Sequence, residues 1–351
     1  MEAYIVKGYR TAVAKAKKGG FKNYRSDDMA VEVLKHLVGQ VPGLDPTTVD
    51  DVIVGCANPE GEQGLQVGRL ISARALGIEV PGITINRYCA SGLEAIAMAV
   101  AKIKSGMGQI YIAGGTESMS LIPMTGYKLS PSYKANMENI NYHVSMGATA
   151  EAVAEKFNIS REAADTFSFK SHQKAAHAID QGHFQDEIVP ITVEDVYVKD
   201  GKKVSSSHTV SVDEGVRRDT TIEGLSKLRA VFKQGGIITA GNASQTSDGA
   251  AFTLVMSEEK VKELGLEPQA RMAACSVGGV HPLYMGIGPC EAIPKALQQV
   301  GLQLSDIEQI ELNEAFAAQA LAVIQEAGLD PDTVNVNGGA IAMGHPLGCT
   351  G

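Results

Sequence analysis

The sequence predicts an α/β protein in which strands alternate with helices and end in glycine-rich corners. Residues 52–54, 110–113 and 251–256 form short apolar runs with the length and residue types of buried strands. Residues 29–37 and 93–103 instead carry apolar side chains at helical spacing. With 44% hydrophobic residues and 38 glycines, the 351-residue chain can bury a large core with many close-packed corners. We therefore expect a layered α/β architecture.

The first part of the chain supplies several of these elements. Residues 1–6 are typical of a first strand rather than of a signal peptide. Ser26 or Asp27 can cap the helix that follows. Another helix is expected near residues 64–76.

Residues 83–92 predict a strand that runs into a tight corner around Cys89. The helical pattern starts directly afterwards, so we expect a helix to begin within one or two residues of Cys89. The unpaired N–H groups and positive dipole at a helix N-terminus favour a thiolate and can receive an oxyanion. A small buried cysteine that closes a strand-helix turn explains the local sequence equally well.

Charge and cysteine usage exclude several classes of protein. The net charge of -9 argues against a nucleic acid or an anionic membrane as partner. The five cysteines, at positions 56, 89, 275, 290 and 349, have neither disulfide-framework nor metal-ligand spacing. No apolar run is long enough to cross a bilayer. We therefore expect a cytoplasmic protein without a metal site.

The character of the chain changes between residues 119 and 246, where Pro, Tyr, Ser and charged residues replace the regular alternation. We expect an inserted segment with one long helix, begun by Ser160 and ended by Gly182, and otherwise irregular structure. Its end gathers the basic residues Lys199, Lys202, Lys203, Arg217, Arg218, Lys227, Arg229 and Lys233. This group could bind the phosphates of a ligand or could form a solvated face.

The chain also repeats itself. Residues 43–54 match 301–312, and residues 83–86 match 334–337. Two related halves are implied. If the halves pack about a pseudo-dyad, the corner at 338–348 faces the Cys89 corner across one cleft.

This packing would place His345 opposite Cys89, with Asn313 pointing the same way. A cysteine beside a neutral histidine suits nucleophilic catalysis, because the imidazole can take the thiol proton. His345 could also be a simple turn residue. The residues after Cys89 do not fit the signature of papain-like proteases.

Seven motifs, in one order and spread over the whole chain, resemble those of the thiolases, the acetyl-CoA acyltransferases. The motifs are 86–93 (NRYCASGL), 115–119 (GTESM), 213–217 (DEGVR), 239–244 (TAGNAS), 285–289 (MGIGP), 313–316 (NEAF) and 338–346 (GGAIAMGHP). The resemblance implies the five-layered αβαβα thiolase fold with two similar halves. These would be an N-terminal half at 1–118 and 247–267, a CoA-binding loop domain at 119–246 and a C-terminal half at 268–351.

The resemblance also implies roles for individual residues. Cys89 would be the acyl-accepting nucleophile, His345 its base, and Asn313 the holder of an oxyanion-hole water. The implied CoA contacts are Arg217 near the adenine, Leu228 and Phe232 along the nucleotide, and Ser244 beside the pantetheine, while Met146, Met285 and Phe316 would line the acyl tunnel. CoA would be a substrate, with no permanently bound cofactor.

The implied reaction is thiolysis of a 3-oxoacyl-CoA in fatty-acid β-oxidation. Ser145, which precedes Met146-Gly147, resembles the degradative 3-ketoacyl-CoA thiolases, whereas short-chain biosynthetic thiolases carry His there. A biosynthetic thiolase that forms acetoacetyl-CoA is the alternative. A second alternative is a module that binds CoA and catalyses no reaction.

The family resemblance further implies a homodimer or homotetramer, and it allows a partner enzyme of fatty-acid oxidation. In the family the pattern continues past the His345 corner to a second catalytic cysteine, whereas the sequence here ends at Gly351. We therefore expect either a fragment of a longer thiolase, with an incomplete C-terminal half, or a protein able at most to acylate slowly at Cys89. Cys349 belongs to a different motif, so we expect it to be a packed corner residue.

Overall fold

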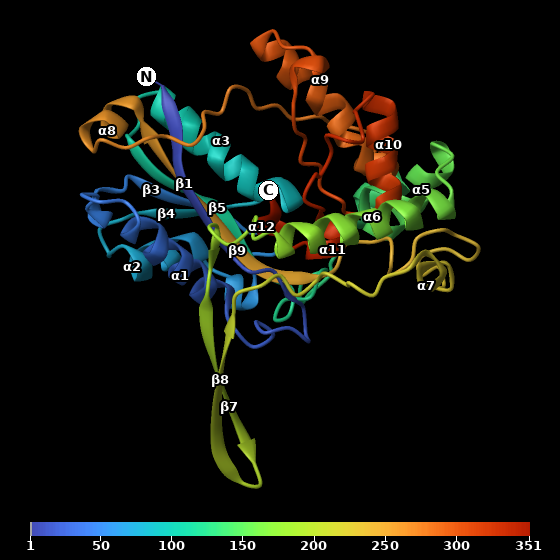
Figure 1. Cartoon of the computed structure of the whole chain (residues 1–351), viewed down its shortest axis with the longest axis horizontal. Helices are drawn as coiled ribbons and strands as arrows, with labels where there is room; N and C mark the ends of the chain where they lie inside the picture. Colours follow the sequence, from blue (N-terminus) through green and yellow to red (C-terminus); the bar gives the residue numbers. More distant parts are fainter. Residues whose placement is uncertain (1) are drawn as a thin grey trace.

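The structure is a computed structural model that describes residues 2–351, apart from the side chain of Lys199 (Figure 1). Met1, which the sequence places in the first strand, lies outside the described residues. The central sheet has the order β4 (Gly82–Ile85), β3 (Asp51–Gly55), β5 (Ile110–Ser118), β9 (Ser247–Ser257), β1 (Ala3–Thr11) and β6 (Ile188–Val189), and β2 (Ala14–Lys15) also pairs with β9. The pairs β3–β4, β3–β5 and β1–β6 are parallel, whereas β9 runs antiparallel to β5 and β1. The alternating pattern therefore predicted the sheet correctly.

Helices cover both faces of this sheet. On one face lie α1 (Ser26–Gly39) and α2 (Val67–Ala75), and on the other lies α3 (Ser91–Lys104). Successive strand residues point to opposite faces, so Val52 and Val54 pack with α1, while Ile53 packs with α3. This explains why the β3 run is apolar throughout.

The expected cap of α1 is wrong. Arg25 is the residue that precedes the helix, and no side chain caps it. Asp27 is buried in the first turn and forms an ion pair with Arg74 of α2. Its carboxylate therefore joins the two helices instead of capping one of them.

The second half of the chain is mainly helical. It contains η5 (Pro282–Ile287), α9 (Gly288–Val300), α10 (Ala317–Ala327), α11 (Ala340–Met343) and α12 (Leu347–Thr350). Ile310 and Val334 form a parallel bridge, and the N-terminal pair β3–β4 is parallel in the same way. Leu312, Val334 and the inner face of α10 form a small apolar core beneath it.

The inserted segment is more regular than expected. Ser160 caps α6 (Arg161–Asp180), which confirms the long helix, and three shorter helices accompany it: α4 (Tyr133–Glu138), α5 (Met146–Lys156) and α7 (Ile222–Ser226). The remaining elements of the chain are α8 (Glu258–Glu263) and the 3-10 turns η1 (Pro46–Thr48), η2 (Gly61–Gln63), η3 (Tyr88–Ala90), η4 (Ile140–His143) and η6 (Leu304–Asp306).

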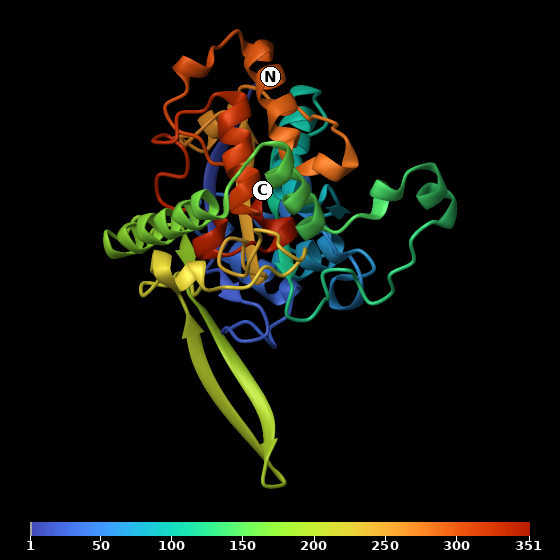
Figure 2. The ribbon, with the colours of Figure 1, turned by 90° about the vertical axis from the view of Figure 1, so that its right-hand side faces the viewer.

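A long hairpin contradicts the prediction of irregular structure. Strands β7 (Ile191–Lys199) and β8 (Lys202–Val210) form an antiparallel ribbon that extends from the body (Figure 1). Asp200 and Gly201 connect them with φ of 52° and 74°, the positive values that a tight hairpin turn requires. The Asp-Gly pair between alternating residues was the signal for it. Figure 2 shows the ribbon and the segment around α4 extending in different directions.

The basic residues of the insertion do not form one cluster. Lys202 and Lys203 lie on the hairpin, while Arg218 pairs with Asp180 and Lys233 pairs with Glu155. Two of these charges are therefore already paired with carboxylates on exposed surface. No helix among residues 2–351 combines the length and hydropathy needed to span a lipid bilayer.

Candidate active site

The corner that carries Cys89 is held by short hydrogen bonds from neutral side chains. Cys89 lies in the single turn η3, directly before α3, which confirms the expected start of the helix. Tyr88 has a φ of 46°, a left-handed conformation that is uncommon for a residue with a side chain. Asn86 Oδ1 accepts from the Tyr88 N–H at 2.7 Å, and Ser91 Oγ donates to the Tyr88 carbonyl at 2.6 Å. These contacts over-determine the turn and fix the position of the thiol.

His345 lies in a loop between two short helices, and the loop needs glycine on both sides. Gly344 has a φ of 113°, and a Cβ there would lie 2.8 Å from a methyl group of Val13. A Cβ on Gly348 would lie 2.7 Å from the Cα of Cys56. Both distances are too short for a real side chain, so the backbone approaches the N-terminal half as closely as glycine allows.

Two buried carboxylates anchor this loop. Glu117 Oε2 accepts from the Gly348 N–H at 2.8 Å, and Glu314 Oε2 accepts from the Ile341 N–H at 3.1 Å. Both carboxylates are about 1% exposed or less. Burial raises the pKa of each, while the hydrogen bonds that they accept oppose this rise. Sequence reasoning assigned no role to Glu117 or Glu314, although both lie inside quoted motifs.

The two halves meet at Cys89, His345 and Asn313. His345 Nε2 lies 3.1 Å from Cys89 Sγ, across 256 positions of sequence. Asn313 Nδ2 lies 3.3 Å from the same nitrogen. The other ring nitrogen, Nδ1, lies 2.6 Å from Thr350 Oγ1. Asn313 Oδ1 is buried and has no hydrogen-bond partner within residues 2–351.

The electrostatics favour a neutral thiol beside a neutral imidazole. Burial raises the pKa of Cys89 to about 11 and lowers the pKa of His345 to about 4. The expected lowering of the thiol pKa by the helix N-terminus is therefore outweighed by desolvation. A thiolate therefore forms most readily when the thiol proton passes to His345.

Several residues that the resemblance assigns to CoA lie together. The rings of Phe232 and Phe316 meet edge to face with centroids 6.1 Å apart. The Ser244 N–H donates at 2.9 Å to the carbonyl oxygen of Ala315, the residue before Phe316. Phe232 also packs on Gly147, the residue after Met146. The structure thus brings Met146, Phe232, Ser244 and Phe316 into one neighbourhood.

The other assigned residues lie on separate segments. Met285 lies in η5 and is 43% exposed. The backbone N–H of Arg217 donates to His172 Nδ1 at 3.1 Å, while its own side chain is exposed. Leu228 is half-exposed in the loop after α7.

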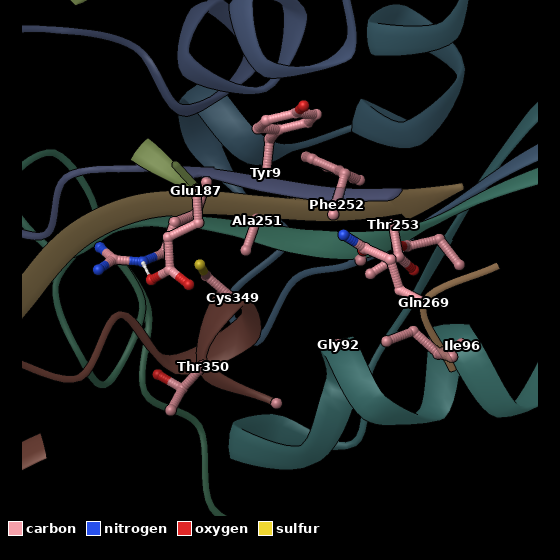
Figure 3. Close-up of a pocket in the computed structure, with 15 residues that line it drawn as sticks. Tyr9, Gly92, Ile96, Glu187, Ala251, Phe252, Thr253, Gln269, Cys349 and Thr350 are labelled. Carbon is pink, nitrogen blue, oxygen red and sulfur yellow. Dashed lines mark hydrogen bonds and ion pairs between the residues drawn. The ribbon is translucent and has the colours of Figure 1, made fainter. Parts of the chain in front are cut away.

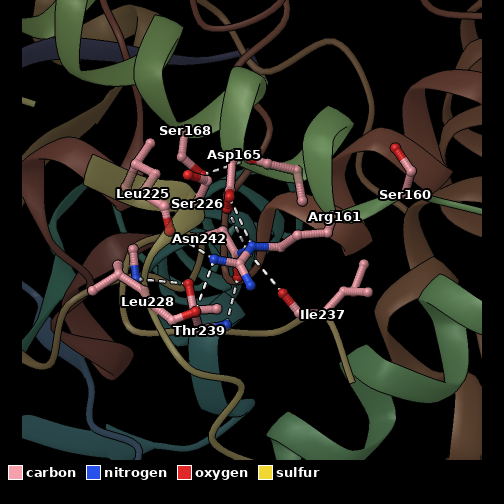
Figure 4. Close-up of polar contacts among 12 residues, drawn as sticks. Ser160, Arg161, Asp165, Ser168, Leu225, Ser226, Leu228, Ile237, Thr239 and Asn242 are labelled. Atoms are coloured by element: carbon pink, nitrogen blue, oxygen red, sulfur yellow. Dashed lines mark hydrogen bonds and ion pairs between the residues drawn. The ribbon is translucent and has the colours of Figure 1, made fainter. Parts of the chain in front are cut away.

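A polar network that sequence reasoning missed holds the Leu228 loop in place (Figure 4). Arg161 donates to the carbonyls of Leu225 at 2.6 Å and Leu228 at 3.0 Å. Its Nε pairs with buried Asp165 at 2.7 Å, and Asp165 accepts from Asn242 Nδ2 at 2.9 Å. The only sequence signal was the i,i+4 spacing of Arg161 and Asp165 on the predicted long helix.

Cys349 is a buried residue of α12. It lines a pocket with Tyr9, Ala251 and Phe252 of the central sheet, and Gly92 and Thr350 also border this pocket (Figure 3). Burial raises the pKa of its thiol to about 12, which keeps it protonated. Within residues 2–351, no group of three or more His, Cys, Asp or Glu side chains could hold a metal ion.

Comparison with known proteins identifies the family. Residues 3–259 match the model of the thiolase N-terminal domain, and residues 266–351 match that of the thiolase C-terminal domain. The chain is 51% identical to the 3-ketoacyl-CoA thiolase of Bacillus subtilis, over 100% of this chain and 90% of that protein. It is 42% identical to the 3-oxoadipyl-CoA/3-oxo-5,6-dehydrosuberyl-CoA thiolase of Escherichia coli, again over 100% and 90%.

A solved structure agrees with these relatives. The acetyl-CoA acetyltransferase of Bacillus anthracis superposes with a TM-score of 0.87 at 39% identity, covering 99% of this chain and 89% of the other. The matches include both halves of the sequence and the segment between them. The chain therefore belongs to the thiolase family, is an acetyl-CoA acyltransferase and has the thiolase fold.

Proposed function

We propose that this thiolase cleaves 3-oxoacyl-CoA by transferring the acyl group first to Cys89 and then to CoA. The observation that carries the proposal is the 3.1 Å contact between Cys89 Sγ and His345 Nε2. A nucleophile and a base within hydrogen-bond reach, each on a rigidly held turn, are what covalent acyl transfer requires.

In the first step Cys89 sulfur attacks the 3-keto carbon, and His345 Nε2 takes the thiol proton. The bond between C2 and C3 then breaks, and its electron pair leaves with the acetyl-CoA enolate. The enolate carbon gains one proton, which balances the proton that Cys89 lost. In the second step the sulfur of free CoA takes the acyl group from Cys89, and its thiol proton restores the thiol of Cys89.

Asn313 is our candidate for stabilising the charge that develops on the substrate oxygen. Its amide lies 3.3 Å from His345 Nε2, so it borders the reacting atoms. Its buried Oδ1 is free to accept from a water, which could in turn donate to the oxyanion. The unpaired N–H groups at the start of α3, two residues after Cys89, are a second candidate source of hydrogen bonds to the oxyanion.

We further propose that CoA lies along the face formed by Ser244, Phe232, Leu228 and Arg217, with Met146, Met285 and Phe316 around the acyl chain. The edge-to-face pair of Phe232 and Phe316 supports a continuous apolar lining between the nucleotide and the acyl group. CoA is a substrate in this scheme and not a bound cofactor.

The degradative direction with a broad range of acyl chains is our preferred substrate assignment, and the names of several relatives support it. Ser145 caps α5 through its hydroxyl, at 3.4 Å from the Ala148 N–H. Because Ser145 stands where the biosynthetic thiolases carry His, no imidazole is present at this position beside the acyl site. Acetoacetyl-CoA synthesis remains the second candidate, because a solved relative is an acetyl-CoA acetyltransferase.

The test is covalent capture. After incubation with acetoacetyl-CoA or a longer 3-oxoacyl-CoA, peptide mass spectrometry should find the acyl group on Cys89. Cys89→Ala should fold normally, bind CoA and form no thioester. Acylation at other cysteines alone would overturn the assignment, and CoA binding with no thioester on wild-type Cys89 would favour a binding module.

We also propose a homodimer or homotetramer in the cytoplasm. Strand β4 is the edge of the central sheet, and around it Leu65, Ile83, Tyr88 and Leu93 are exposed. An uncovered edge with apolar neighbours is suited to pairing with a second copy. Light scattering should give twice the chain mass or four times it, whereas a clean monomer at micromolar concentration would contradict the proposal. A partner enzyme of fatty-acid oxidation stays a prediction from the family.

A further inference from the structure

The hydroxyl of Thr350 is placed to decide which nitrogen of His345 carries the proton. Thr350 Oγ1 lies 2.6 Å from His345 Nδ1 and 2.9 Å from the carbonyl oxygen of Pro346. A hydroxyl has one proton, and a carbonyl oxygen can only accept. If Thr350 donates to Pro346, its lone pairs remain for His345, and Nδ1 must be the donor.

We propose that Thr350 is a positioning residue that accepts the Nδ1–H of His345 and thereby leaves Nε2 unprotonated toward Cys89. This inference rests on the proposed function of Cys89 and His345. It adds the tautomer that allows His345 to act as the base.

The neighbours of Nε2 support the same arrangement. Cys89 Sγ–H at 3.1 Å and the Asn313 amide at 3.3 Å are both donors. With the proton on Nε2, the ring could donate to the weakly accepting Cys89 sulfur, but the Asn313 amide would face an N–H, and a Thr350 hydroxyl that donated to Nδ1 would leave two oxygens 2.9 Å apart without a proton between them. The Nδ1–H assignment is compatible with all four contacts, with the Nε2 lone pair shared between Cys89 and Asn313, whereas the Nε2–H assignment leaves the contacts of Asn313 and Pro346 unsatisfied.

The contact also matters when His345 becomes charged. On taking the thiol proton, the ring becomes an imidazolium that still donates Nδ1–H to Thr350. Hydrogen bonds to charged groups are stronger than neutral ones, so the hydroxyl stabilises the charged state more than the neutral state. Titratable groups on the neighbouring elements are Cys89 on η3, Glu117 on β5 and Cys349 on α12. Burial, with a smaller contribution from the charge of Glu117, raises the pKa of both thiols.

The substitution Thr350→Val keeps the shape of the side chain and removes the hydroxyl, while Thr350→Ser restores it. The rate at which iodoacetamide alkylates Cys89, followed by peptide mass spectrometry from pH 6 to 10, reports formation of the thiolate without any turnover. We expect the rate at pH 7 to fall about 10- to 100-fold in Thr350→Val, with the pH profile displaced to higher pH, and to recover in Thr350→Ser.

A direct readout of the tautomer accompanies the rates. In protein with ¹⁵N-labelled histidine, long-range ¹H–¹⁵N correlations distinguish an Nδ1–H ring from an Nε2–H ring, and His345→Asn identifies the signals of His345 among the eight histidines. Wild type and Thr350→Ser should show Nδ1–H. An Nε2–H ring in wild type overturns the inference.

An unchanged alkylation profile in Thr350→Val also overturns it. A slower rate with the same profile midpoint and a lower melting temperature would indicate a merely structural role and count equally against it. The proposed function fails separately, if wild-type Cys89 takes no acyl group from a 3-oxoacyl-CoA whichever tautomer is found.

Discussion

Cys89 precedes a 14-residue helix, whereas His345 lies between two helices of four residues each. The cysteine corner is fixed locally, by Asn86 and Ser91, which lie within three residues of it. The histidine loop is fixed from a distance, by Glu117 and Glu314 on other segments. The nucleophile thus depends on neutral local contacts and the base on buried charge.

The difference follows from how many backbone N–H groups the neighbouring helices leave without a partner. A helix of 14 residues pairs most of its backbone groups internally and leaves only those of its end turns unpaired, so a few side-chain contacts suffice to hold its start. Helices as short as α11 and α12 leave most of their N–H groups without an intrahelical partner. A buried carboxylate can accept several of these at once, and it holds the loop without a regular element.

The largest effect should come from the base itself. His345→Ala should slow acylation of Cys89 by about 10²- to 10⁴-fold, because the thiol then has no adjacent group to take its proton. Rapid-quench measurements with acetoacetyl-CoA give the rate. His183→Ala is the matched control, since this exposed histidine contacts Asn337 away from the site and should keep the wild-type rate. Equal rates in His345→Ala and wild type would remove His345 from the mechanism.

Next in size is the loss of an anchor of the histidine loop. Glu117 accepts from the N–H groups of Ala57 at 2.7 Å and Gly348 at 2.8 Å, and from Gln63 Nε2 at 2.5 Å. Glu117→Ala leaves these buried donors without a partner, so the free energy of unfolding should fall by about 3 to 5 kcal/mol. Urea denaturation provides the measurement.

Glu314→Ala should behave similarly, because Glu314 accepts from Ser171, Asn335 and Ile341. Exposed Glu308→Ala is the control and should change stability by no more than about 0.5 kcal/mol. A tolerated Glu117→Ala, with an unchanged rate of Cys89 acylation, would refute the idea that buried charge fixes the base.

A third carboxylate tests the electrostatic side of the comparison. Asp248 follows Ser247, whose hydroxyl contacts the His345 N–H at 3.2 Å. Burial raises the pKa of Asp248 from 3.8 to about 6, so the folded state binds this proton more tightly than the unfolded state does. The stability that this group contributes is therefore present below about pH 4 and is lost as the pH rises to about 6.

Asp248→Asn removes that dependence. Between pH 4 and pH 6, the unfolding free energy of wild type should fall relative to the variant by at most about 3 kcal/mol. Glu117 and Glu314 also have raised pKa values, but they are present in both proteins and cancel in the difference. Stability curves that stay parallel over this range would contradict the assignment.

Local patterns predicted the parts of the fold that depend on neighbouring residues. The apolar runs located β3, β5 and β9, and Ser160 marked the start of α6. The missed hairpin β7–β8 carried a local signal in Asp200 and Gly201, so that error was one of interpretation. The cap of α1 failed for another reason, because Asp27 is used in a tertiary contact with Arg74.

The candidate site was predictable where residue chemistry and repeat spacing coincide, because both point to Cys89 and His345. Glu117 was not predictable as an anchor, because its contact with Gly348 joins residues 231 positions apart. The link from Thr350 to His345 spans only five positions, yet it depends on a rotamer and a turn that no pattern of residue types specifies. Such contacts follow from the packing of the two halves.

The smallest effect should come from the cysteine corner. Ser91 is fully buried, and its hydroxyl accepts from the Arg87 N–H at 2.8 Å and donates to the Tyr88 carbonyl at 2.6 Å. Ser91→Ala removes two neutral hydrogen bonds, and we expect a loss of about 1 to 2 kcal/mol in the free energy of unfolding.

Acylation of Cys89 should slow only a few-fold in Ser91→Ala, because Asn86 and the rest of α3 still define the turn. Ser105→Ala, at the exposed end of the same helix, controls for the loss of a serine hydroxyl and should be close to wild type. If Ser91→Ala were as damaging as Glu117→Ala, the nucleophile would depend on its local contacts as strongly as the base depends on buried charge. The contrast between the two corners would then be one of geometry and not of energy.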